Sequence, residues 1–429
     1  MQVSVESGEG LERRMTVELP AEQIEAEVDK RLKQIGQTAK LDGFRPGKVP
    51  MNMLRRVYGS QVLQEVYGQL VETSYQQALQ QENLHPAGLP KIEPKEATEE
   101  GLFGYIATLE VMPEIQLAKL EGKITRPIAE VGEQDVEGMI EKLRKQRATW
   151  NAVERAAGEG DQVKISFAGK VDGEVFEGGS ADNVPLVLGS KRMIEGFEDG
   201  VVGMIKDEKR TLELKFPEDY RVEELAGKPV TFDVEVAEVA EEVLPAVDEA
   251  FAKEFGAEEG VDKLKSDIRE NMERELAQRV QAKIKSQAMD LIYEQNKIEI
   301  PKAMIEEEID TLLKQTRERL GQQGAGSLEL PRDMFEEQAR RRVNLGLVVG
   351  EIIKQHEIKI DNDRVRKTIE DFASSYEQPE EVVKYYYGNQ EQLAAVQNVV
   401  LEDQVVDWVL EQTEVNDEQT TFAELTAEG

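Results

Sequence analysis

GDQVKISFAGKVDGEVFEGG, residues 160–179, is the stretch that decides the fold of the middle of the chain. In its segment QVKISFAG, apolar and polar residues alternate, which is typical of a β-strand with one buried face. The alternation returns in PLVLG (185–189), RTLELKFP (210–217) and VTFDVEVAEV (230–239), while RMIEGFEDGVVGM (192–204) predicts one short helix. We therefore predict a small, glycine-rich β domain over residues 150–242.

The residues before this domain predict an α+β domain over 1–112. QVSVE and RMTVELP alternate like paired strands, and GLFGYIATLEVMP returns as a further strand. Two helices are expected between these strands, the second from about Met51 to Gln81. Residues 113–149 are expected to form a connector that holds one charged helix and packs toward the helical body.

Residues 243–429 are almost purely helical in pattern. In the longest predicted helix, apolar residues recur nearly every fourth position from Val261 to Ile292. A step of four residues drifts by about 40° around a helix, so this apolar stripe rotates, and the helix should contact several neighbours in turn or leave part of the stripe open. The last residues, NDEQTTFAELTAEG, are polar and acidic and are predicted to be disordered. The predicted fold class is therefore multidomain α+β, ending in an all-α body with long helical arms.

Composition excludes several functions. The 429 residues include 53 basic and 87 acidic ones, a net charge of −34, so a general positive surface for nucleic acid is absent and no DNA partner is expected. With no cysteine and two histidines, disulfides and thiol chemistry are impossible, and no metal or other cofactor is expected. No basic segment followed by an apolar run opens the chain, and no stretch is apolar enough to span a membrane. We therefore expect a cytoplasmic protein without a membrane partner.

The loop KLDGFRPGKVP, residues 40–50, is an unusual connection between the first two predicted helices. It presents Phe44 and Arg45 on a stiff turn, and Lys48 follows closely. Between Lys30 and Arg56 the chain has eight basic residues and one acidic residue, which makes a basic island in an acidic chain. Such an island suits a phosphate-rich partner, with Phe44 adding apolar contact. The alternative is a solvated basic surface with a structural phenylalanine.

This loop resembles the ribosome-docking signature of the trigger factor family. The resemblance covers the whole chain, because N-terminal strands, loop, glycine-rich middle and helical end follow in the same order. It implies that the large ribosomal subunit, beside the polypeptide exit tunnel, is contacted by Gly43, Phe44, Arg45, Gly47 and Lys48. Pro46 stands where some members carry a further basic residue, which removes one phosphate contact. Unfolded nascent polypeptides are the second implied partner, and a homodimer of the free protein is left open.

The middle domain resembles the FKBP-type prolyl isomerases. The resemblance implies a catalytic pocket formed by Phe176, Glu177, Ile194, Phe197, Tyr220 and Phe232, with Phe167 and Phe216 also lining it. The backbone N–H of Ile194 would hold the substrate carbonyl, and Glu177 would orient the substrate at the rim. Phe197 occupies the position where many relatives have a tryptophan. From the residues alone, the alternative is that these side chains are plain core, notably Phe167 or Phe216.

The helical end is expected to hold unfolded chains on exposed apolar surface. The candidate client-binding residues are Ile309, Leu313, Leu320 and Met334, and the alternative for each is packing inside the core. The aromatic triplet Tyr385–Tyr387 is expected to pack rather than to recognise a partner. Together these features predict a ribosome-associated chaperone that also isomerises X–Pro bonds. The alternatives are a ribosome-independent holdase whose β domain only binds clients, and a periplasmic chaperone-isomerase, which the missing signal segment and the basic loop disfavour.

Overall fold

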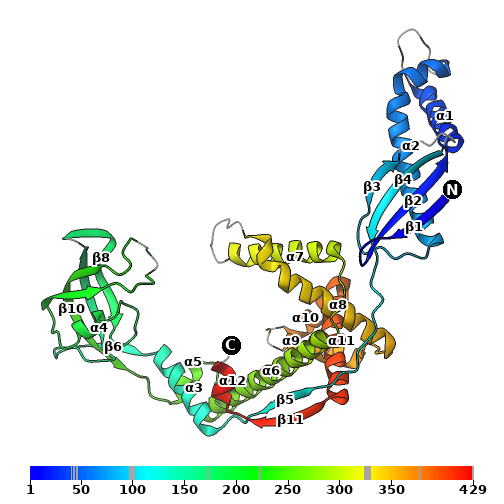
Figure 1. The fold of residues 1–429 in the computed structure, drawn as a ribbon. Coiled ribbons are helices and arrows are strands. Elements are labelled where there is room, and N and C mark those ends of the chain that lie inside the picture. The colour runs from blue at the N-terminus through cyan, green and yellow to red at the C-terminus, as the bar shows by residue number, and fades with distance from the viewer. Residues whose placement is uncertain are drawn as a thin grey trace. The chain divides into compact units, whose positions relative to one another are not determined.

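The computed structural model describes residues 1–39, 41, 44, 47–95, 102–171, 173–220, 222, 224–322, 330–374, 376 and 378–427, without the side chains of residues 21, 102, 103, 177 and 322 (Figure 1). Backbone contacts divide the chain into two units, which are Met1–Arg126 with Ala282–Asp417, and Pro127–Gln281 with Glu418–Gly429. Helix α6 (Val261–Gln295) contributes to both units. Among the described helices, none is long and apolar enough to cross a bilayer.

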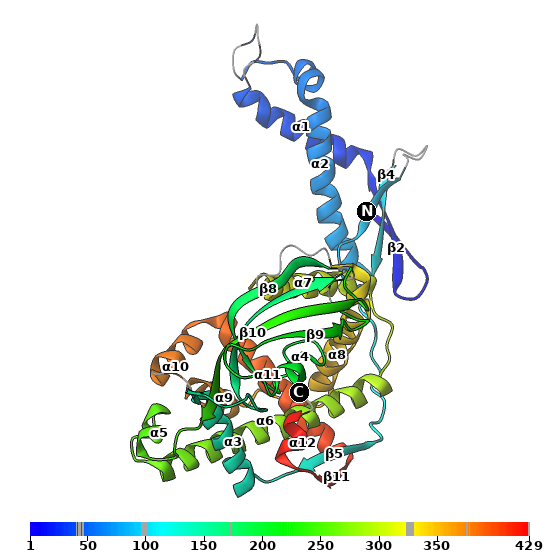
Figure 2. The same cartoon turned by 90° about the vertical axis from the view of Figure 1, so that its left-hand side faces the viewer.

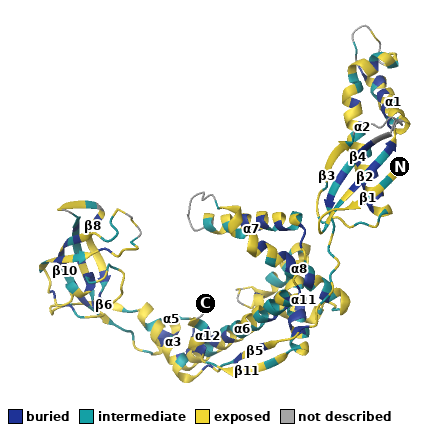
Figure 3. Ribbon diagram, in the orientation of Figure 1, coloured by how far each residue is buried: buried dark blue, intermediate teal, exposed yellow. Residues whose placement is uncertain are grey.

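The N-terminal residues form the predicted α+β arrangement. An antiparallel sheet has the spatial order β1 (Gln2–Ser7), β2 (Glu12–Pro20), β4 (Leu102–Glu110) and β3 (Lys91–Lys95). Residues of β2 and β4, including Met15, Val17 and Tyr105, are buried against α2 (Met51–Gln81) (Figure 3). Helices α1 (Ala21–Thr38) and α2 share a second apolar cluster, which contains Leu32 and Leu54. The loop 40–50 connects these two helices.

The middle residues form one antiparallel sheet of five strands, where the sequence predicted four. Strand β10 (Pro229–Val243) pairs along one edge with β7 (Gln162–Val171) and along the other with β9 (Lys209–Lys215) and β6 (Thr149–Val153). Strand β8 (Glu174–Val187) pairs with β7, and α4 (Phe197–Val201) packs on one face of the curved sheet (Figure 2). Strand β6 was missed because it is short and half-buried at only two positions.

The helical body consists of α7 (Lys302–Gln322), α8 (Glu336–Gln355), α9 (Asn362–Ala373), α10 (Pro379–Gly388), α11 (Gln390–Gln412) and the C-terminal part of α6. The rotating stripe of α6 is confirmed. Its residues from Leu264 to Leu276 pack with α3 (Glu133–Gln146) and α5 (Glu249–Glu254), whereas Ala288 and Ile292 pack with α8 and α11. An apolar face that turns along one helix therefore serves two separate cores.

The described C-terminal residues form a strand and a helix, so the disorder predicted for them is wrong. Strand β11 (Glu414–Gln419) pairs with β5 (Lys123–Ile128), and the Arg126 guanidinium binds both carboxylate oxygens of Asp417. Helix α12 (Phe422–Ala427) buries its Phe and Leu side chains in the cluster that contains α3 and α5. Thr421 and Glu424 cap this helix reciprocally, which is a capping box that the acidic composition concealed.

Candidate functional sites

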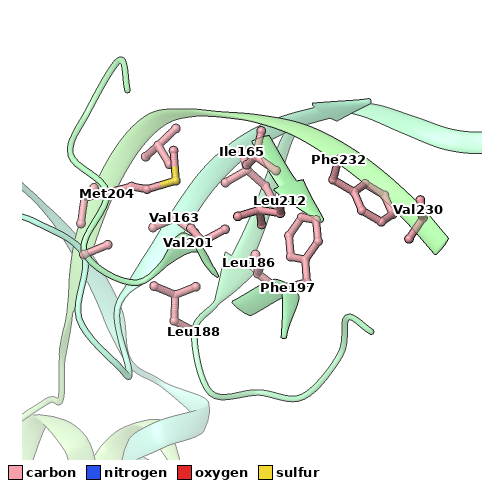
Figure 4. Packing of buried hydrophobic residues seen from close by; sticks show 14 of the residues in the cluster. Val163, Ile165, Leu186, Leu188, Phe197, Val201, Met204, Leu212, Val230 and Phe232 are labelled. Carbon is pink, nitrogen blue, oxygen red and sulfur yellow. The ribbon is translucent and has the colours of Figure 1, made fainter. Parts of the chain in front are cut away.

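An aromatic cluster lies between the sheet and α4 in the middle domain, where the sequence predicted the catalytic pocket. The Phe197 side chain is 0% exposed, and its ring meets those of Phe232 and Phe167 edge-to-face, with centroids 5.2 and 5.8 Å apart. Figure 4 shows the Phe197 ring beside Leu212 and Phe232 within the apolar cluster of the domain. Edge-to-face pairs at these separations are favourable, so the rings hold one another in a fixed arrangement.

A second group of rings continues the pocket toward its rim. The Phe176 ring contacts that of Phe216 at 5.7 Å and that of Phe232 at 6.4 Å, and the Tyr220 ring lies 4.6 Å from that of Phe216. Phe176, Tyr220, Ile194 and Phe167 are half-buried, whereas Phe197, Phe216 and Phe232 are buried. A substrate therefore has access to the first four side chains, and the buried rings form the floor beneath them.

The alternative that these side chains only fill the hydrophobic core fits Phe216, which is buried, but not Phe167, which is half-buried. Phe167 lies at the point where the pairing of β7 with β8 shifts register, between Ile165 and Phe167 and again beyond Ala168, with the extra residues on β8. The Phe167 ring contacts the buried rings of Phe197 and Phe232, and the residue remains partly accessible.

Two glycines that sequence reasoning did not single out make room for the rings. A Cβ atom at Gly169 would lie 2.6 Å from Cε1 of Phe232 and 2.7 Å from Cε1 of Phe176. At Gly179 it would lie 2.8 Å from Cε1 and Cζ of Phe176. A glycine inside a strand often marks a place where another group approaches the backbone closely. Here the approaching group is the ring of Phe176 or Phe232.

The backbone at Ile194 supplies a polar group beside these rings. The carbonyl of Ile194 accepts the N–H of Phe197 at 3.1 Å, in a turn that contains Gly196 with φ of +85°. Within the described part of the chain, no acceptor receives the N–H of Ile194. The site thus combines apolar walls with one available donor. The Glu177 side chain lies outside the described residues, so its expected role at the rim stays a prediction.

This pocket offers no group for nucleophilic or metal chemistry among the described residues. No cluster of three or more His, Cys, Asp and Glu side chains lies close enough to hold a metal ion in the described ranges. The described side chains that the sequence assigned to the pocket, such as Phe176, Ile194 and Tyr220, are aromatic or aliphatic. Such a site can bind a flat apolar ring with its attached amide and shield both from water.

The loop 40–50 is described at Leu41, Phe44 and from Gly47 onward, so Gly43 and Arg45 lie outside the described residues. Phe44 is 38% exposed, and its N–H donates to the carbonyl of Leu41 at 3.0 Å. The Gly47 N–H donates to the carbonyl of Gly36 at 3.1 Å, with Gly47 at φ +80°. This bond ties the end of the loop to α1, and the left-handed backbone there favours glycine.

Only some of the basic residues around this loop are free of ion pairs in the described structure, so the basic island has fewer available cations than the sequence indicated. Lys30, Arg31 and Arg55 are paired with Glu27, Glu65 and Asp29, respectively. In the described part of the chain, Lys33, Lys48 and Arg56 are exposed and have no ion pair. The cations that remain available to a polyanion therefore lie at the loop and at the facing ends of α1 and α2.

The expected exposure of two client-binding candidates is wrong. Ile309 and Leu313 are only 4% and 5% exposed, because α7 packs this face on Ala339 and Val343 of α8. Leu320, farther along α7, is half-buried, and Met334 is 71% exposed on the short helix η1 (Arg332–Phe335). Only the latter two remain candidates for contact with a partner.

Other accessible apolar surface in the helical body was not predicted. A groove of about 680 Å³ runs beside α7 and α8, with Met289, Met304 and Leu347 among its apolar lining and Glu307, Glu308 and Glu402 among its acidic lining. On α9 and α10, Phe372, Tyr385 and Tyr387 are exposed, and Tyr386 packs beside Val383 in a small core. The expectation of simple packing for Tyr385–Tyr387 therefore describes Tyr386 alone.

Three family models match separate parts of the chain. Residues 1–143 match the model described as bacterial trigger factor protein, and residues 260–411 match its C-terminus. Residues 153–237 match the FKBP-type peptidyl-prolyl cis-trans isomerases. The fold and the pocket thus define a folding factor of the chaperone–isomerase class.

Full-length relatives narrow this class to one family. The trigger factor of Pseudomonas paraeruginosa is 49% identical over 429 residues, which cover 99% of this chain and 98% of the relative. That of Thioalkalivibrio sulfidiphilus is 46% identical over 427 residues, covering 99% and 98%. A solved structure of a trigger factor chaperone, 20% identical, covers 96% of this chain and 99% of the other, with a TM-score of 0.48. The chain belongs to the trigger factor family, whose known role is ribosome association, and its middle domain is an FKBP-type peptidyl-prolyl cis–trans isomerase.

Proposed function

We propose that this chain docks on the large ribosomal subunit beside the tunnel exit, holds nascent polypeptides on its helical body and isomerises their X–Pro bonds in the aromatic pocket. The observation that carries the enzymatic part is the combination of half-buried rings, a buried aromatic floor and the available N–H of Ile194. A protein that acts on nascent chains at the ribosome is located in the cytoplasm.

Isomerisation in this pocket follows from the chemistry of the amide. Rotation about an X–Pro bond has a barrier of about 18–20 kcal/mol, because amide resonance must be broken. Resonance separates charge, so water stabilises the planar amide more than the twisted one. In the aromatic pocket the proline ring contacts Phe176, Tyr220 and the floor, while the N–H of Ile194 holds the substrate carbonyl. The enzyme thus lowers the barrier by desolvation and orientation and needs no covalent step.

Docking uses the loop 40–50 and the cations beside it. The exposed Phe44 supplies apolar contact, and Lys48, Lys33 and Arg56 supply charges that are not already paired in the described residues. By resemblance to the family, Gly43 and Arg45 complete the contact. The acidic remainder of the chain repels ribosomal RNA, which confines docking to this end of the α1–α2 pair.

Client binding uses the exposed apolar surface of the helical body. The groove beside α7 and α8 combines methionine side chains, which adapt to many partners, with carboxylates that keep the surface soluble. Leu320 and Met334 extend the accessible apolar surface along α7 and η1. When no ribosome is present, the same surfaces are available for a homodimer of the free protein.

The isomerase part is tested on the full-length chain with a proline-containing tetrapeptide in a protease-free assay. We expect the wild type to accelerate isomerisation and Phe176→Ala to lower kcat/KM by roughly tenfold or more, since the variant opens the pocket to water. The matched control is Val175→Ala, a change at an exposed neighbour of Phe176. A wild-type rate equal to the uncatalysed rate would refute the proposed reaction.

The docking part is tested by co-sedimentation with purified ribosomes. Phe44→Ala combined with Arg45→Ala should abolish binding and leave isomerase activity intact. Salt should weaken the wild-type contact, because phosphate binding releases counterions. Leu89→Ala, at a fully exposed position outside the loop, is the matched control. Undiminished sedimentation of the double variant would exclude this loop as the docking site.

A further inference from the structure

The buried carboxylate of Glu198 has no part in the function derived so far. Glu198 follows Phe197 on α4, and the residue is 8% exposed. Within the described residues, its carboxylate forms no ion pair with Lys191, Arg192 or any other cation. A buried carboxylate is costly unless hydrogen bonds replace its lost hydration, so its partners are informative.

Those partners are five consecutive residues of one segment, 189–193. Oε2 of Glu198 accepts the backbone N–H groups of Gly189 at 2.7 Å and Lys191 at 3.1 Å. Oε1 accepts the N–H groups of Arg192 at 2.9 Å and Met193 at 3.4 Å, and the hydroxyl of Ser190 at 3.2 Å. Hydrogen bonds to an ionised acceptor are among the strongest in proteins, so this carboxylate organises the whole segment.

The segment needs such an organiser because its backbone is unfavourable and belongs to no helix or strand. Gly189 has φ of +92°, and Lys191 has φ of +54°, a left-handed conformation that costs free energy for a residue with a Cβ atom. Strained backbone of this kind persists only where surrounding contacts determine it. Here Glu198 accepts five hydrogen bonds from the segment, beside one from the Ser190 N–H to the carbonyl of Val187.

The segment ends at the donor of the isomerase pocket. Residue 194 follows directly, and its N–H has no acceptor in the described part of the chain. Its carbonyl accepts the N–H of Phe197, the residue beside Glu198. Glu198 therefore connects the floor of the pocket to the segment that carries the available N–H.

We propose that Glu198 is a positioning residue of the isomerase, whose carboxylate fixes segment 189–193 so that the Ile194 N–H is held ready for the substrate carbonyl. The inference depends on the proposed reaction and on the donor role of Ile194. Burial by itself raises the pKa of Glu198, but the N–H groups of Lys191, Arg192, Met193 and Gly189 outweigh burial and hold this pKa below its ordinary value. The carboxylate is therefore ionised at neutral pH.

The test compares kcat and KM of full-length variants with the proline tetrapeptide. Glu198→Gln replaces one acceptor oxygen by an amide that faces N–H donors, so we expect kcat to fall about tenfold through lost orientation. KM should stay within about twofold, because the apolar walls still bind the proline ring. Glu195→Gln is the matched control, since this exposed carboxylate lies between Ile194 and Phe197 without a hydrogen bond among the described residues.

Two further variants keep the test decisive if Glu198→Gln fails to fold. Glu198→Asp retains the charge but reaches fewer donors, and Ser190→Ala removes one donor and leaves the carboxylate intact. Both should lower kcat by about two- to fivefold with near-normal KM. A folded Glu198→Gln with wild-type kcat, or wild-type kcat in either further variant, would overturn the inference. An inactive wild type would instead reject the proposed reaction, which separates the two failures.

Discussion

The isomerase domain and the helical body bury their apolar residues in different ways. In the isomerase domain, one continuous cluster joins the sheet to α4 and includes the floor of the aromatic pocket. In the helical body, the described apolar residues divide among separate clusters around α7 and α8, around α8 and α11, and around α9 and α11. Met334, Phe372 and Tyr385 stay exposed there.

This difference matches the two tasks that we propose for these two parts of the chain. Twisting one kind of amide bond requires rings and a donor in a single geometry, which a continuous close-packed core provides. Holding many unfolded sequences requires accessible apolar surface that adapts, and methionine and exposed aromatic side chains provide it. The comparison therefore predicts that small changes in packing damage the isomerase domain first.

The largest effect is expected for Phe197→Ala. Removing this fully buried ring should destabilise the isomerase domain by about 3–5 kcal/mol and abolish its activity, because the floor becomes a cavity. Hydrogen exchange of the β7 and β10 amides in the full-length chain measures the change. Met334→Ala, at an exposed position of the helical body, should alter local stability by less than about 0.5 kcal/mol. Equal effects of the two changes would break the comparison.

A change at Ile309 separates packing from client binding within the helical body. Ile309→Ala should cost about 2–5 kcal/mol of stability, because the side chain fills the α7–α8 core. Leu320→Ala, on the same helix but half-buried, should cost less and should reduce suppression of client aggregation in light scattering. If Ile309→Ala left hydrogen exchange of α7 unchanged, the burial of this face would be wrong.

Glycine substitutions sharpen the contrast in packing. Gly169→Ala should destabilise the isomerase domain by about 1–3 kcal/mol, since the new methyl group overlaps the rings of Phe176 and Phe232. Gly350→Ala in α8 places its methyl group in open space and should stabilise that helix by about 0.5–1 kcal/mol. Hydrogen exchange at the two sites should move in opposite directions.

The last prediction concerns an acid dependence of the isomerase domain. Asp161 accepts hydrogen bonds from the Arg155 guanidinium and from the Gly158 N–H, which lower its pKa although burial raises it. A lowered pKa in the folded state means that this stabilisation is present above the ordinary Asp pKa of about 3.9 and is lost as pH falls through the folded value. Asp161→Asn should therefore cost about 1–2 kcal/mol at pH 7 and remove part of the acid dependence. An unchanged pH profile of unfolding would contradict the assignment.

Much of this architecture was predictable from local pattern. Alternation in QVKISFAG and VTFDVEVAEV predicted β7 and β10, and the rotating stripe of α6 predicted its several partners. The prediction failed where the pattern is weak or where composition misleads. Strand β6 is too short to alternate clearly, and the acidic C-terminal residues concealed β11 and α12.

The individual sites were likewise predicted only in part from the sequence. The aromatic residues that the resemblance assigned to the pocket cluster in space, but their separation into buried and half-buried rings was not predicted. Ile309 and Leu313 have the same apolar character as Leu320, and only the packing of α8 on one part of α7 distinguishes them. The basic island also has fewer unpaired cations than the sequence indicated, because Arg31 and Arg55 form ion pairs with acidic residues of the neighbouring helix.

The sequence by itself determined the order of the domains, the periods of their strands and helices, and the residue types available for chemistry, because these depend on neighbours in the chain. Tertiary structure decided which apolar faces close, which cations stay unpaired, and that a carboxylate on α4 holds five residues of the preceding segment. Such outcomes depend on contacts between residues that no local pattern connects. Burial, charge compensation and the position of a donor are therefore properties of the folded chain.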